Sequence, residues 1–428
     1  VWNGMIDRRP ALIVRCAGAE DVVQAVNFGR ENGLRVAVRG CGHNIAGKAV
    51  CDDGLVIDLS LMKDVRVDPE ARTARVEAGA SLGDFDRAAQ AVGLATPLGI
   101  NSTTGVAGLT LGGGFGWLSR KYGMTIDNLR AVDIVTADGE LRRASEDEHA
   151  DLFWGVRGGG GNFGVVTSFE FRLHPVGPEV LAGPMVYAHD DARDVLRYIR
   201  DANADAPDEL AVWTILRKAP PLPFLPEAVH GTDVLIVVPF YAGDPEEGMK
   251  WIAPLRAYRA PIADAVGPHP YAAFQQAFDP LLTEGARNYW KSHNFAALSD
   301  AAIDAALKYA ARLPSDQSEI FFGHLGGAMR RVPTAATAYP HRDVEYVMNV
   351  HTRWEDAGQD EACIAWARSV YDAMMPYATG GAYVNFISED RGEERKAYGQ
   401  NFARLSKLKH QYDPTNLFRV NQNVAPTA

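Results

Sequence analysis

Residues 105–116 read GVAGLTLGGGFG, and this glycine-rich run is the stretch that decides the fold. Two further glycine-rich loops lie nearby in the sequence, at 39–47 (RGCGHNIAG) and 158–164 (GGGGNFG). Glycine lets the backbone approach a ligand closely and turn its N–H groups toward anionic oxygens. One such loop is ordinary turn chemistry, but three of them favour a binding site for a large, flat cofactor that carries a pyrophosphate.

The third loop contains GGGNFG (159–164), which satisfies the G-x-G-x-x-G pattern of dinucleotide-binding folds. That pattern binds a pyrophosphate where the loop opens a helix. Here the loop is followed by VVTSFEF (165–171), whose β-branched and aromatic residues predict a strand. We therefore do not expect an NAD site of the Rossmann type.

Residues 79–83 (GASLG) match the G-x-S-x-G turn that carries the nucleophile of many hydrolases. The alternative is that Ser81 caps a helix over 82–92, with Asp84 completing a capping box. No oxyanion loop and no suitably placed Asp and His are recognisable beside it. A serine hydrolase that uses Ser81 is therefore a distant alternative.

The chain has 428 residues, a formal charge of −11 and a pI near 5.5. This length predicts two domains. The acidic balance argues against nucleic acid or an anionic membrane as a partner, and no apolar run is long enough to span a bilayer. The sequence leaves the oligomeric state unknown.

The four cysteines, Cys16, Cys41, Cys51 and Cys363, form no C-x-x-C pair and no disulfide-dense pattern, which favours a reducing cytoplasm. No Cys/His spacing suggests a metal, so no metal site is expected. The first residues, VWNGMIDRRP, lack the pattern of a secretion signal. Because the sequence also lacks an initiator Met, a removed leader stays open.

Hydrophobic periodicity predicts helices and strands in the first third, then longer elements beyond Pro175. Asp138-Gly139 between two apolar runs indicates a hairpin. The fold class is α+β, with an antiparallel sheet backed by helices in the second part. The expected helices are 19–32, 82–92, 192–202, 301–312 and 361–375, and the expected strands are 34–38, 55–59, 132–136, 141–144, 165–173, 210–216, 234–241, 319–324 and 345–353.

The glycine loops and the C-terminus together resemble a known family. RGCGHN (39–44), GVAGLTLGGGFG (105–116) and SRKYG (119–123) are similar to the FAD-binding domain of the vanillyl alcohol oxidase and p-cresol methylhydroxylase type. YVN (383–385) and YDPTNLF (412–418) resemble the tail of berberine bridge enzyme-like oxidoreductases. The resemblance spans nearly the whole chain and is weakest across 180–280.

The resemblance implies a two-part FAD-binding domain over 1–178, a substrate domain over 179–378 whose antiparallel sheet covers the flavin, and a C-terminal segment over 379–428 that returns to the FAD. It implies an FAD-dependent oxidase that moves a hydride from a small alcohol, amine or activated C–H compound to the flavin and then to oxygen. The alternative within the class is a dehydrogenase with another acceptor, and a flavin-binding protein without turnover is the non-enzyme alternative. Substrate identity cannot be read from the sequence.

The resemblance also assigns residues to the cofactor. His43 occupies the position of covalent attachment to the flavin. The expected cofactor-binding residues are Arg39, Gly40, Cys41, Gly42, His43, Asn44, Gly47, Asn101, Thr103, Thr104, Gly105, Gly108, Gly112, Gly113, Gly116, Trp117, Gly164, Val165, Val166, Tyr383, Asn385 and Asn423.

Three positions depart from the family pattern. Cys41 stands where the loop usually has glycine. Asn101 aligns with the cysteine that forms a second flavin bond in some members, so a single bond through His43 is expected. Phe386 aligns with the tail tyrosine that often serves as the base, and a phenyl ring cannot accept a proton.

Thr104 aligns with the residue that screens the flavin from oxygen, and its modest size favours an oxidase.

The missing tyrosine raises the question of which residue takes the substrate proton. Alternation along the strand expected over 345–353 puts Val347, Asn349 and His351 on one face. By alignment from Trp354, that face carries catalytic groups in relatives. Imidazole titrates near neutral pH, which suits a base. His351 is the first candidate, Tyr383 the second and Asn349 a neighbour, with His293 and His324 as further possibilities.

Overall fold

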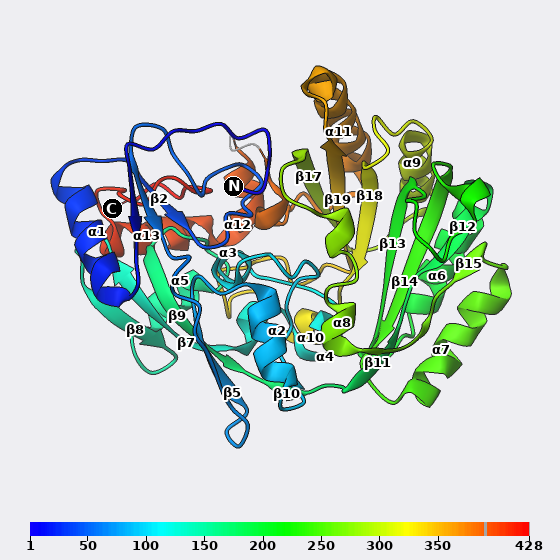
Figure 1. The fold of residues 1–428 in the computed structure, drawn as a ribbon, viewed down its shortest axis with the longest axis horizontal. Coiled ribbons are helices and arrows are strands. Elements are labelled where there is room, and N and C mark those ends of the chain that lie inside the picture. Colours follow the sequence, from blue (N-terminus) through cyan, green and yellow to red (C-terminus); the bar gives the residue numbers. More distant parts are fainter. Residues whose placement is uncertain (389–391, 428) are drawn as a thin grey trace.

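The computed structural model describes residues 1–388 and 392–427. Two sheet systems lie side by side, the N-terminal one with the C-terminal segment packed against it, the other a large sheet with helices on its outer face (Figure 1). The chain crosses from the first to the second near Glu179, where the large sheet begins. Over the described residues, no helix has the length and apolar character needed to cross a bilayer.

In the described chain, the N-terminal part contains two larger sheets and one two-stranded sheet. The first is parallel, with the order β1 (Leu12–Arg15), β3 (Leu55–Asp58), β2 (Val36–Arg39). The second is antiparallel, with the order β4 (Val65–Asp68), β5 (Thr73–Glu77), β9 (Gly164–Arg172), β7 (Leu129–Thr136), β8 (Leu141–Ser145). Their inner faces share a core with α1 (Ala19–Glu31), α2 (Leu82–Gln90) and α5 (Ala150–Val156).

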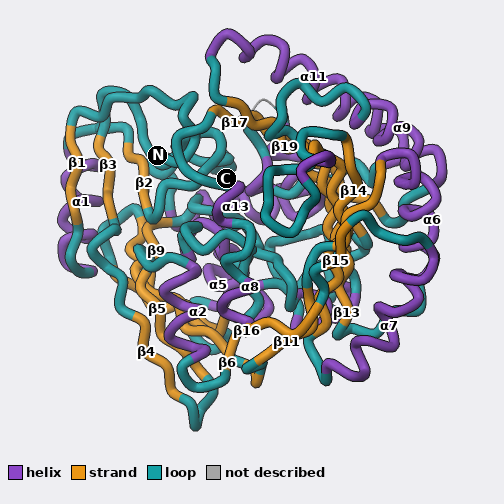
Figure 2. The backbone as a smooth tube through the Cα atoms, turned by 45° about the vertical axis from the view of Figure 1, so that its right-hand side comes forward, coloured by secondary structure: helices purple, strands orange, loops and turns teal. Residues whose placement is uncertain are grey.

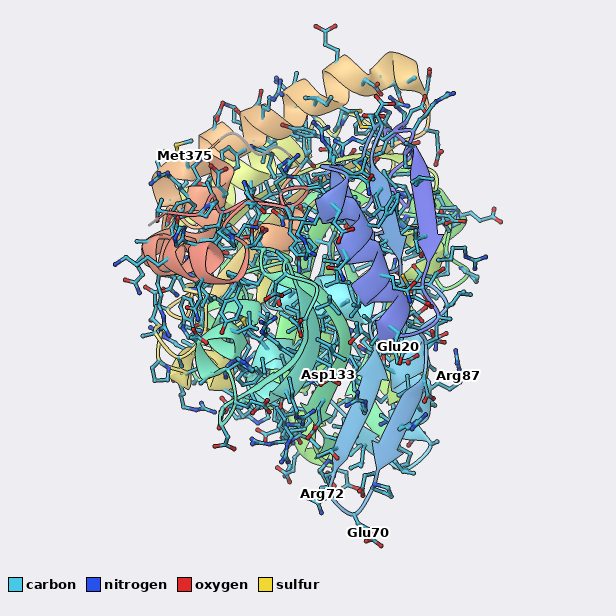
Figure 3. The ribbon with its side chains drawn as sticks, turned by 90° about the vertical axis from the view of Figure 1, so that its left-hand side faces the viewer. Glu20, Glu70, Arg72, Arg87, Asp133 and Met375 are labelled. Carbon is cyan, nitrogen blue, oxygen red and sulfur yellow. The ribbon has the colours of Figure 1, made fainter. Side chains whose placement is uncertain are left out.

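The outer face of the antiparallel sheet is charged. Arg143 donates to Glu170 at 2.6 Å and Arg75 pairs with Asp133, across neighbouring strands. Figure 3 shows Asp133 on this side of the molecule and Glu70 and Arg72 at the tip of the β4–β5 hairpin. One apolar and one charged face is the ordinary pattern of an antiparallel sheet with one side in water.

Three local predictions are confirmed. The Ser81 hydroxyl accepts a hydrogen bond from the Asp84 backbone N–H, and the Asp84 carboxylate accepts one from the Ser81 backbone N–H, which is the capping box of α2. Asp138-Gly139 connects β7 to β8, with Gly139 at φ +84°. The loop 159–164 runs into strand β9 and opens no helix.

The second part is built on a nine-stranded sheet, all of it within the described residues, whose main path runs β15-β12-β14-β13-β18-β19-β17. The four strands that carry the site residues discussed below are β13 (Leu210–Lys218), β18 (Glu319–His324), β19 (Tyr346–Trp354) and β17 (Arg287–Phe295). The others are β11 (Glu179–Ala182), β12 (Met185–Ala188), β14 (Asp233–Tyr241), β15 (Ala263–Asp264) and β16 (Gly267–Pro270). The outer face is covered by α6 (Ala192–Asn203), α7 (Pro245–Tyr258), α9 (Asp300–Ala310) and α11 (Asp360–Met374) (Figure 1).

Strand β17 was not among the strands expected from the sequence. Its residues RNYWKSHNF carry polar side chains on both faces, so no alternation of apolar and polar residues marks it. It pairs with β19 along its whole length, from Arg287 opposite Trp354 to Phe295 opposite Tyr346. Some of its polar side chains have hydrogen-bond partners: the Asn288 amide donates to the Ala286 carbonyl at 2.8 Å, and the Ser292 hydroxyl accepts from the Tyr383 backbone N–H at 3.4 Å.

The C-terminal segment returns to the N-terminal part. Helix α13 (Phe402–Tyr412) lies beside the N-terminal sheets in Figure 2, and Leu405 and Leu417 belong to their core. Buried Lys409 donates to the Asn162 carbonyl at 2.6 Å, which ties the helix to the third glycine loop. The remaining named helices are α3 (Val106–Leu111), α4 (Ser119–Tyr122), α8 (Tyr271–Phe274), α10 (Gly327–Arg331) and α12 (Glu393–Tyr398), and two short strands, β6 (Leu94–Ala95) and β10 (His174–Pro175), pair with each other.

Candidate cofactor and substrate site

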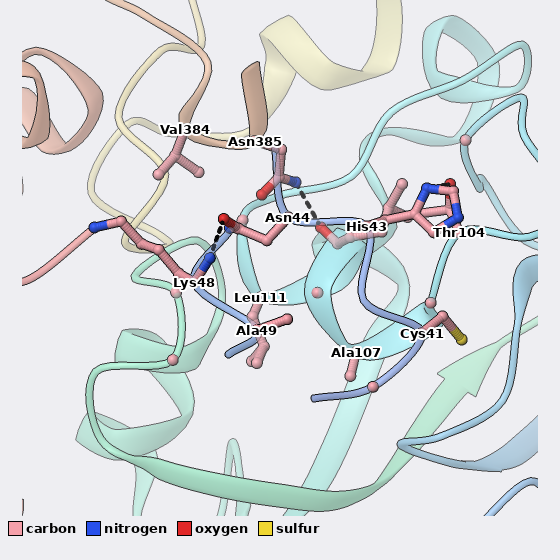
Figure 4. Close-up of a pocket in the computed structure, with 18 of the residues that line it drawn as sticks. Cys41, His43, Asn44, Lys48, Ala49, Thr104, Ala107, Leu111, Val384 and Asn385 are labelled. Carbon is pink, nitrogen blue, oxygen red and sulfur yellow. Dashed lines mark hydrogen bonds between the residues drawn. The ribbon is translucent and has the colours of Figure 1, made fainter. Parts of the chain in front are cut away.

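A large cavity lies where the glycine loops, the inner face of the large sheet and the C-terminal segment meet (Figure 4). It encloses about 1980 Å³ of empty space, part of it open to solvent. The sequence-predicted residues that line it are Gly40, Cys41, Gly42, His43, Asn44, Asn101, Thr104, Gly105, Gly108, Gly112, Gly164, Val165, Val166, Asn349, His351, Tyr383 and Asn385.

Two cavity glycines are not explained by protein packing. A Cβ atom added at Gly108 or Gly161 would meet nothing within 4 Å, and neither backbone has a positive φ. Gly108 lies inside helix α3, where glycine costs roughly 0.5–1 kcal/mol relative to alanine. Bare backbone facing an open cavity is what the close approach of a flat ligand requires. The residues present therefore fit the expected FAD.

His43 lies beside the loop 101–104 on the wall of this cavity. Its Nε2 is 2.9 Å from Thr103 Oγ1 and its Nδ1 is 3.4 Å from Thr104 Oγ1, and its ring stacks on Trp2 with centroids 5.3 Å apart. Figure 4 shows His43 next to Thr104, with Val384 and Asn385 of the tail nearby. Burial lowers the pKa of His43 to about 4. The imidazole is therefore neutral, with a nitrogen lone pair available.

Asn101, at the position of the absent cysteine, holds the loop together. Its Oδ1 accepts from the Thr103 backbone at 3.0 Å and from the Thr103 hydroxyl at 2.6 Å. Its Nδ2 donates to the Leu282 carbonyl at 3.2 Å, across to the second part of the chain. The Asn101 amide therefore has a structural role, because it links the loop to itself and to residue 282.

Seven predicted cofactor residues lie outside the cavity lining, and six of them have a local structural role. Arg39 forms an ion pair with Asp58 at 3.1 Å, and the Thr103 hydroxyl forms a hydrogen bond with His43 Nε2. A Cβ at Gly47 would collide with Ile6, and one at Gly116 would lie 1.7 Å from the Leu98 carbonyl oxygen, so packing alone requires these glycines. The other three are Gly113, which turns at φ +120°, Trp117, which stacks on Trp213 at 4.0 Å, and Asn423.

The inner face of the large sheet carries a row of four side chains. Strand register places Arg217 opposite Glu319, Glu319 opposite His351, and His351 opposite Trp290. Arg217 Nη1 donates to Glu319 Oε2 at 2.8 Å, and Glu319 Oε1 is 3.1 Å from His351 Nδ1. The Trp290 ring meets the His351 ring edge to face, with centroids 4.6 Å apart.

Glu319 was missed as a site residue although its strand was predicted. The residue begins β18 and lines the cavity. Burial by itself would raise the pKa of Glu319, but the charge of Arg217 and the hydrogen bond with His351 outweigh it and hold the pKa below its ordinary value. The signal that could have found it is register, which needs the pairing of β18 with β19 and cannot be read from one strand.

The second nitrogen of His351 faces the cavity. An ionised Glu319 accepts the Nδ1–H, which leaves Nε2 with its lone pair. Nε2 is buried and has no hydrogen-bond partner among the described residues, and His351 as a whole is 5% exposed. Asn349 Oδ1, one step along the same face, is buried and unpartnered there as well. Buried polar atoms in native structures normally have partners, so both atoms await one from a ligand.

Tyr383 lies in the cavity wall with its hydroxyl already engaged. Its oxygen accepts from the Gly114 backbone at 3.1 Å and from Asn385 Nδ2 at 2.9 Å. Burial raises the pKa of its phenol well above the ordinary value. Phe386 lies 4.9 Å from Tyr383, centroid to centroid, and lines the cavity as an apolar group. This geometry disfavours Tyr383 as a proton acceptor.

The two further candidate histidines do not line the cavity. His293 stacks on Tyr371 at 3.9 Å and bonds the Tyr371 carbonyl, on the helix-covered face of the sheet. His324 belongs to a second group of His, Glu and Arg: its Nε2 lies 3.0 Å from Glu345 Oε1 and 2.8 Å from Arg120 Nη1. Burial lowers the pKa of His324 to about 4.

The part of the cavity next to His351 has aromatic walls. Trp290 contacts Phe386 edge to face with centroids 5.6 Å apart, and Trp213 contacts Phe321 in the same way at 5.1 Å. Trp2 contacts Trp290 and Phe115 contacts Phe386, with centroids 5.8 Å and 5.7 Å apart, and both residues line the cavity. The polar side chains here are few: Glu319, Asn349, His351, Asn101 and Tyr383.

Comparison with known proteins agrees with this geometry. The chain matches the model of an FAD binding domain over residues 10–145 and that of the berberine and berberine-like region over 382–425. It is 34% identical to an FAD-linked oxidoreductase of Dictyostelium discoideum, over 99% of this chain and 91% of the relative. It is 31% identical to (R)-6-hydroxynicotine oxidase of Paenarthrobacter nicotinovorans, over 100% of this chain and 93% of the relative.

The fold is shared as closely. The crystal structure of 6-hydroxy-D-nicotine oxidase from Arthrobacter nicotinovorans superposes with a TM-score of 0.89 and 29% identity, covering 100% of this chain and 94% of that one. The protein is thus an FAD-dependent oxidoreductase. It belongs to the family of FAD-linked oxidoreductases with a berberine-like C-terminal region.

Proposed function

We propose that this FAD-dependent enzyme is an oxidase, that FAD is bound covalently through His43, and that His351 takes the substrate proton. The observation that carries the proposal is the buried, unpartnered Nε2 of His351 in the cavity wall, fixed as an acceptor by Glu319. Bound FAD supplies the two-electron acceptor for a hydride from the substrate. The substrate O–H or N–H proton goes to His351 Nε2, and a positioned base of this kind accelerates a reaction by typically 10²–10⁴-fold.

His43 supports the covalent bond because it lies on the cavity wall and is neutral. A protonated imidazole has no lone pair for bond formation, whereas the burial of His43 removes the proton. With Asn101 in place of a cysteine, one bond is expected. Acid-precipitated protein should keep its yellow colour, and the His43→Ala variant should release free flavin. A colourless precipitate from the unmodified protein would rule out the bond.

Thr104 supports reaction with oxygen. Its side chain lines the cavity and is smaller than leucine, and its hydroxyl lies 3.4 Å from His43 Nδ1. Stopped-flow mixing of the reduced enzyme with air-saturated buffer distinguishes the two classes. Fast reoxidation is expected of the oxidase, and reoxidation over many minutes would favour the dehydrogenase alternative.

The proposed activity is tested by an anaerobic screen in which substrate addition bleaches the flavin absorbance near 450 nm. Alcohols, sugars, phenols and cyclic amines are the classes to include. The relative (R)-6-hydroxynicotine oxidase makes hydroxylated ring amines a natural first choice. Bleaching by one class supports turnover, and a protein that binds FAD but is bleached by none of these classes would count against an oxidase of alcohols or amines.

A further inference from the structure

The aromatic walls, the unpartnered atoms and the Arg217–Glu319–His351 row together restrict what the site can hold. We infer that the cavity takes an apolar ring that carries a hydroxyl or amine hydrogen-bond donor, and that Glu319 is the positioning residue that makes His351 select it. The inference rests on the proposed function, since it names the substrate class of the same site.

The aromatic side chains of the cavity wall indicate what kind of ring the ligand has. Six aromatic side chains enclose the space next to His351: Trp2, Phe115, Trp213, Trp290, Phe321 and Phe386. Aromatic faces favour flat apolar rings, which stack on them or meet them edge to face. A polyhydroxylated ring would bury several hydroxyls against these walls, and a buried hydroxyl without a partner costs about 1–3 kcal/mol by mutational data.

The unpartnered atoms decide the polar group. His351 Nε2 can only accept while Nδ1–H is held by Glu319, and Asn349 Oδ1 is an acceptor as well. Trp290 Nε1 is a buried donor that has no partner among the described residues. A hydroxyl both donates and accepts, and an amine N–H donates, so either matches this set. A carboxylate only accepts and would meet the lone pair of Nε2.

Glu319 controls this choice through the histidine. Its carboxylate holds the proton of His351 on Nδ1, and Arg217 at 2.8 Å keeps the carboxylate ionised. In Glu319→Gln the side chain keeps its volume but loses the charge, and its amide can donate to Nδ1. Arg217 donates to the amide oxygen, so the amide NH2 is left to donate to Nδ1; the His351 proton then lies on Nε2, and the atom that faces the cavity becomes a donor.

Phenol, benzoate and myo-inositol test the inference without turnover. All three are six-membered rings of similar width, and neither phenol nor benzoate has a hydride to give. Calorimetric titration of the oxidised holoenzyme at pH 8, supported by flavin difference spectra, gives the three dissociation constants. Phenol should bind at least about tenfold more tightly than benzoate, which corresponds to one net hydrogen bond. Myo-inositol should bind more weakly than phenol.

The variant Glu319→Gln should lose or reverse the preference for phenol over benzoate. Glu345→Gln is the matched control, because it alters the other buried His–Glu pair away from the cavity, and it should keep the wild-type ratio. Flavin content and circular dichroism establish that each variant is folded. Should Glu319→Gln fail to fold, His351→Leu removes the acceptor and should abolish the preference.

Three results would overturn the inference: benzoate bound as tightly as phenol by the wild type, myo-inositol bound as tightly as phenol, or an unchanged ratio in Glu319→Gln. These are binding results on the oxidised enzyme. They are distinct from a failure of the proposed oxidase activity, which appears as flavin that no substrate bleaches.

Discussion

Two groups of histidine, glutamate and arginine lie at the large sheet in the described part of the chain, and their surroundings differ. In the first, His351 turns Nδ1 to Glu319 and leaves Nε2 in the cavity wall. In the second, His324 turns Nε2 to Glu345 and Arg120, stacks on Tyr346 and lies away from the cavity. The same three residue types therefore form a candidate base in one place and a packing contact in the other.

The difference follows from strand position. Residue 351 shares its face of β19 with Asn349, and both line the cavity. His324 ends β18, next to the turn that leads to Gly326 and Gly327, and its partner Arg120 comes from α4 in the N-terminal part. Arg120 also donates to the Leu325 carbonyl at 2.5 Å. The second group therefore connects the two parts of the chain, while the first lines the cavity.

The largest expected difference between the groups is in catalysis. With a substrate from the bleaching screen, His351→Asn should slow flavin reduction by about 10²–10⁴-fold, the usual contribution of a positioned base. His324→Asn should stay within about threefold of the wild type, because His324 does not line the cavity. Anaerobic stopped-flow absorbance at saturating substrate measures both. Equal slowing by the two variants would remove the distinction between the groups.

The pH dependence of stability should show the reverse contrast, because here His324 is expected to have the larger effect. The folded pKa of His324 is lowered to about 4 from 6.5, so the folded state holds the neutral imidazole while the unfolded chain takes up a proton. Stability from this histidine is therefore complete above pH 6.5 and is lost as the pH falls toward 4, by roughly 3 kcal/mol. Urea unfolding should show less loss over this window in His324→Asn than in the wild type. An identical pH dependence in the two proteins would contradict this role for His324.

The smallest effect on chemistry is expected at Tyr383. In Tyr383→Phe the Gly114 N–H and Asn385 Nδ2 lose their common acceptor, which should cost about 1–3 kcal/mol of unfolding free energy. Flavin reduction should change by less than about threefold, because the phenol is protonated and its oxygen is already engaged. Urea unfolding and stopped-flow reduction together measure this variant. A drop in reduction as large as that of His351→Asn would return Tyr383 to the role of base.

The resemblance to a known family and the alternation along one strand together predicted part of the site. The glycine loops, His43 and the tail residues Tyr383 and Asn385 all lie on the cavity wall, and strand alternation placed Asn349 and His351 on one face. Glu319 and Trp290 were not predicted, because their roles depend on which strands pair and in what register. For Trp290 there was a second reason: its strand, β17, shows no apolar alternation and was itself not predicted.

Residues outside the lining show the other limit of sequence reasoning. Gly47 and Gly116 belong to the same glycine-rich motifs as the cavity residues, yet they are glycine because Ile6 and the Leu98 carbonyl leave no room for a Cβ. A motif assigns a segment to the cofactor, whereas only the packed structure tells which of its glycines face the ligand.

The pH profile of flavin reduction tests most directly the claim that His351 takes the substrate proton. Reduction should be measured anaerobically from pH 5 to 10 in the wild type, His351→Asn and His324→Asn. A base accepts the substrate proton only in its unprotonated form, so the rate of the wild type and of His324→Asn should rise with pH, and His351→Asn should lack this rise. A His351→Asn profile that keeps the wild-type rise would contradict the account and place the base on another residue.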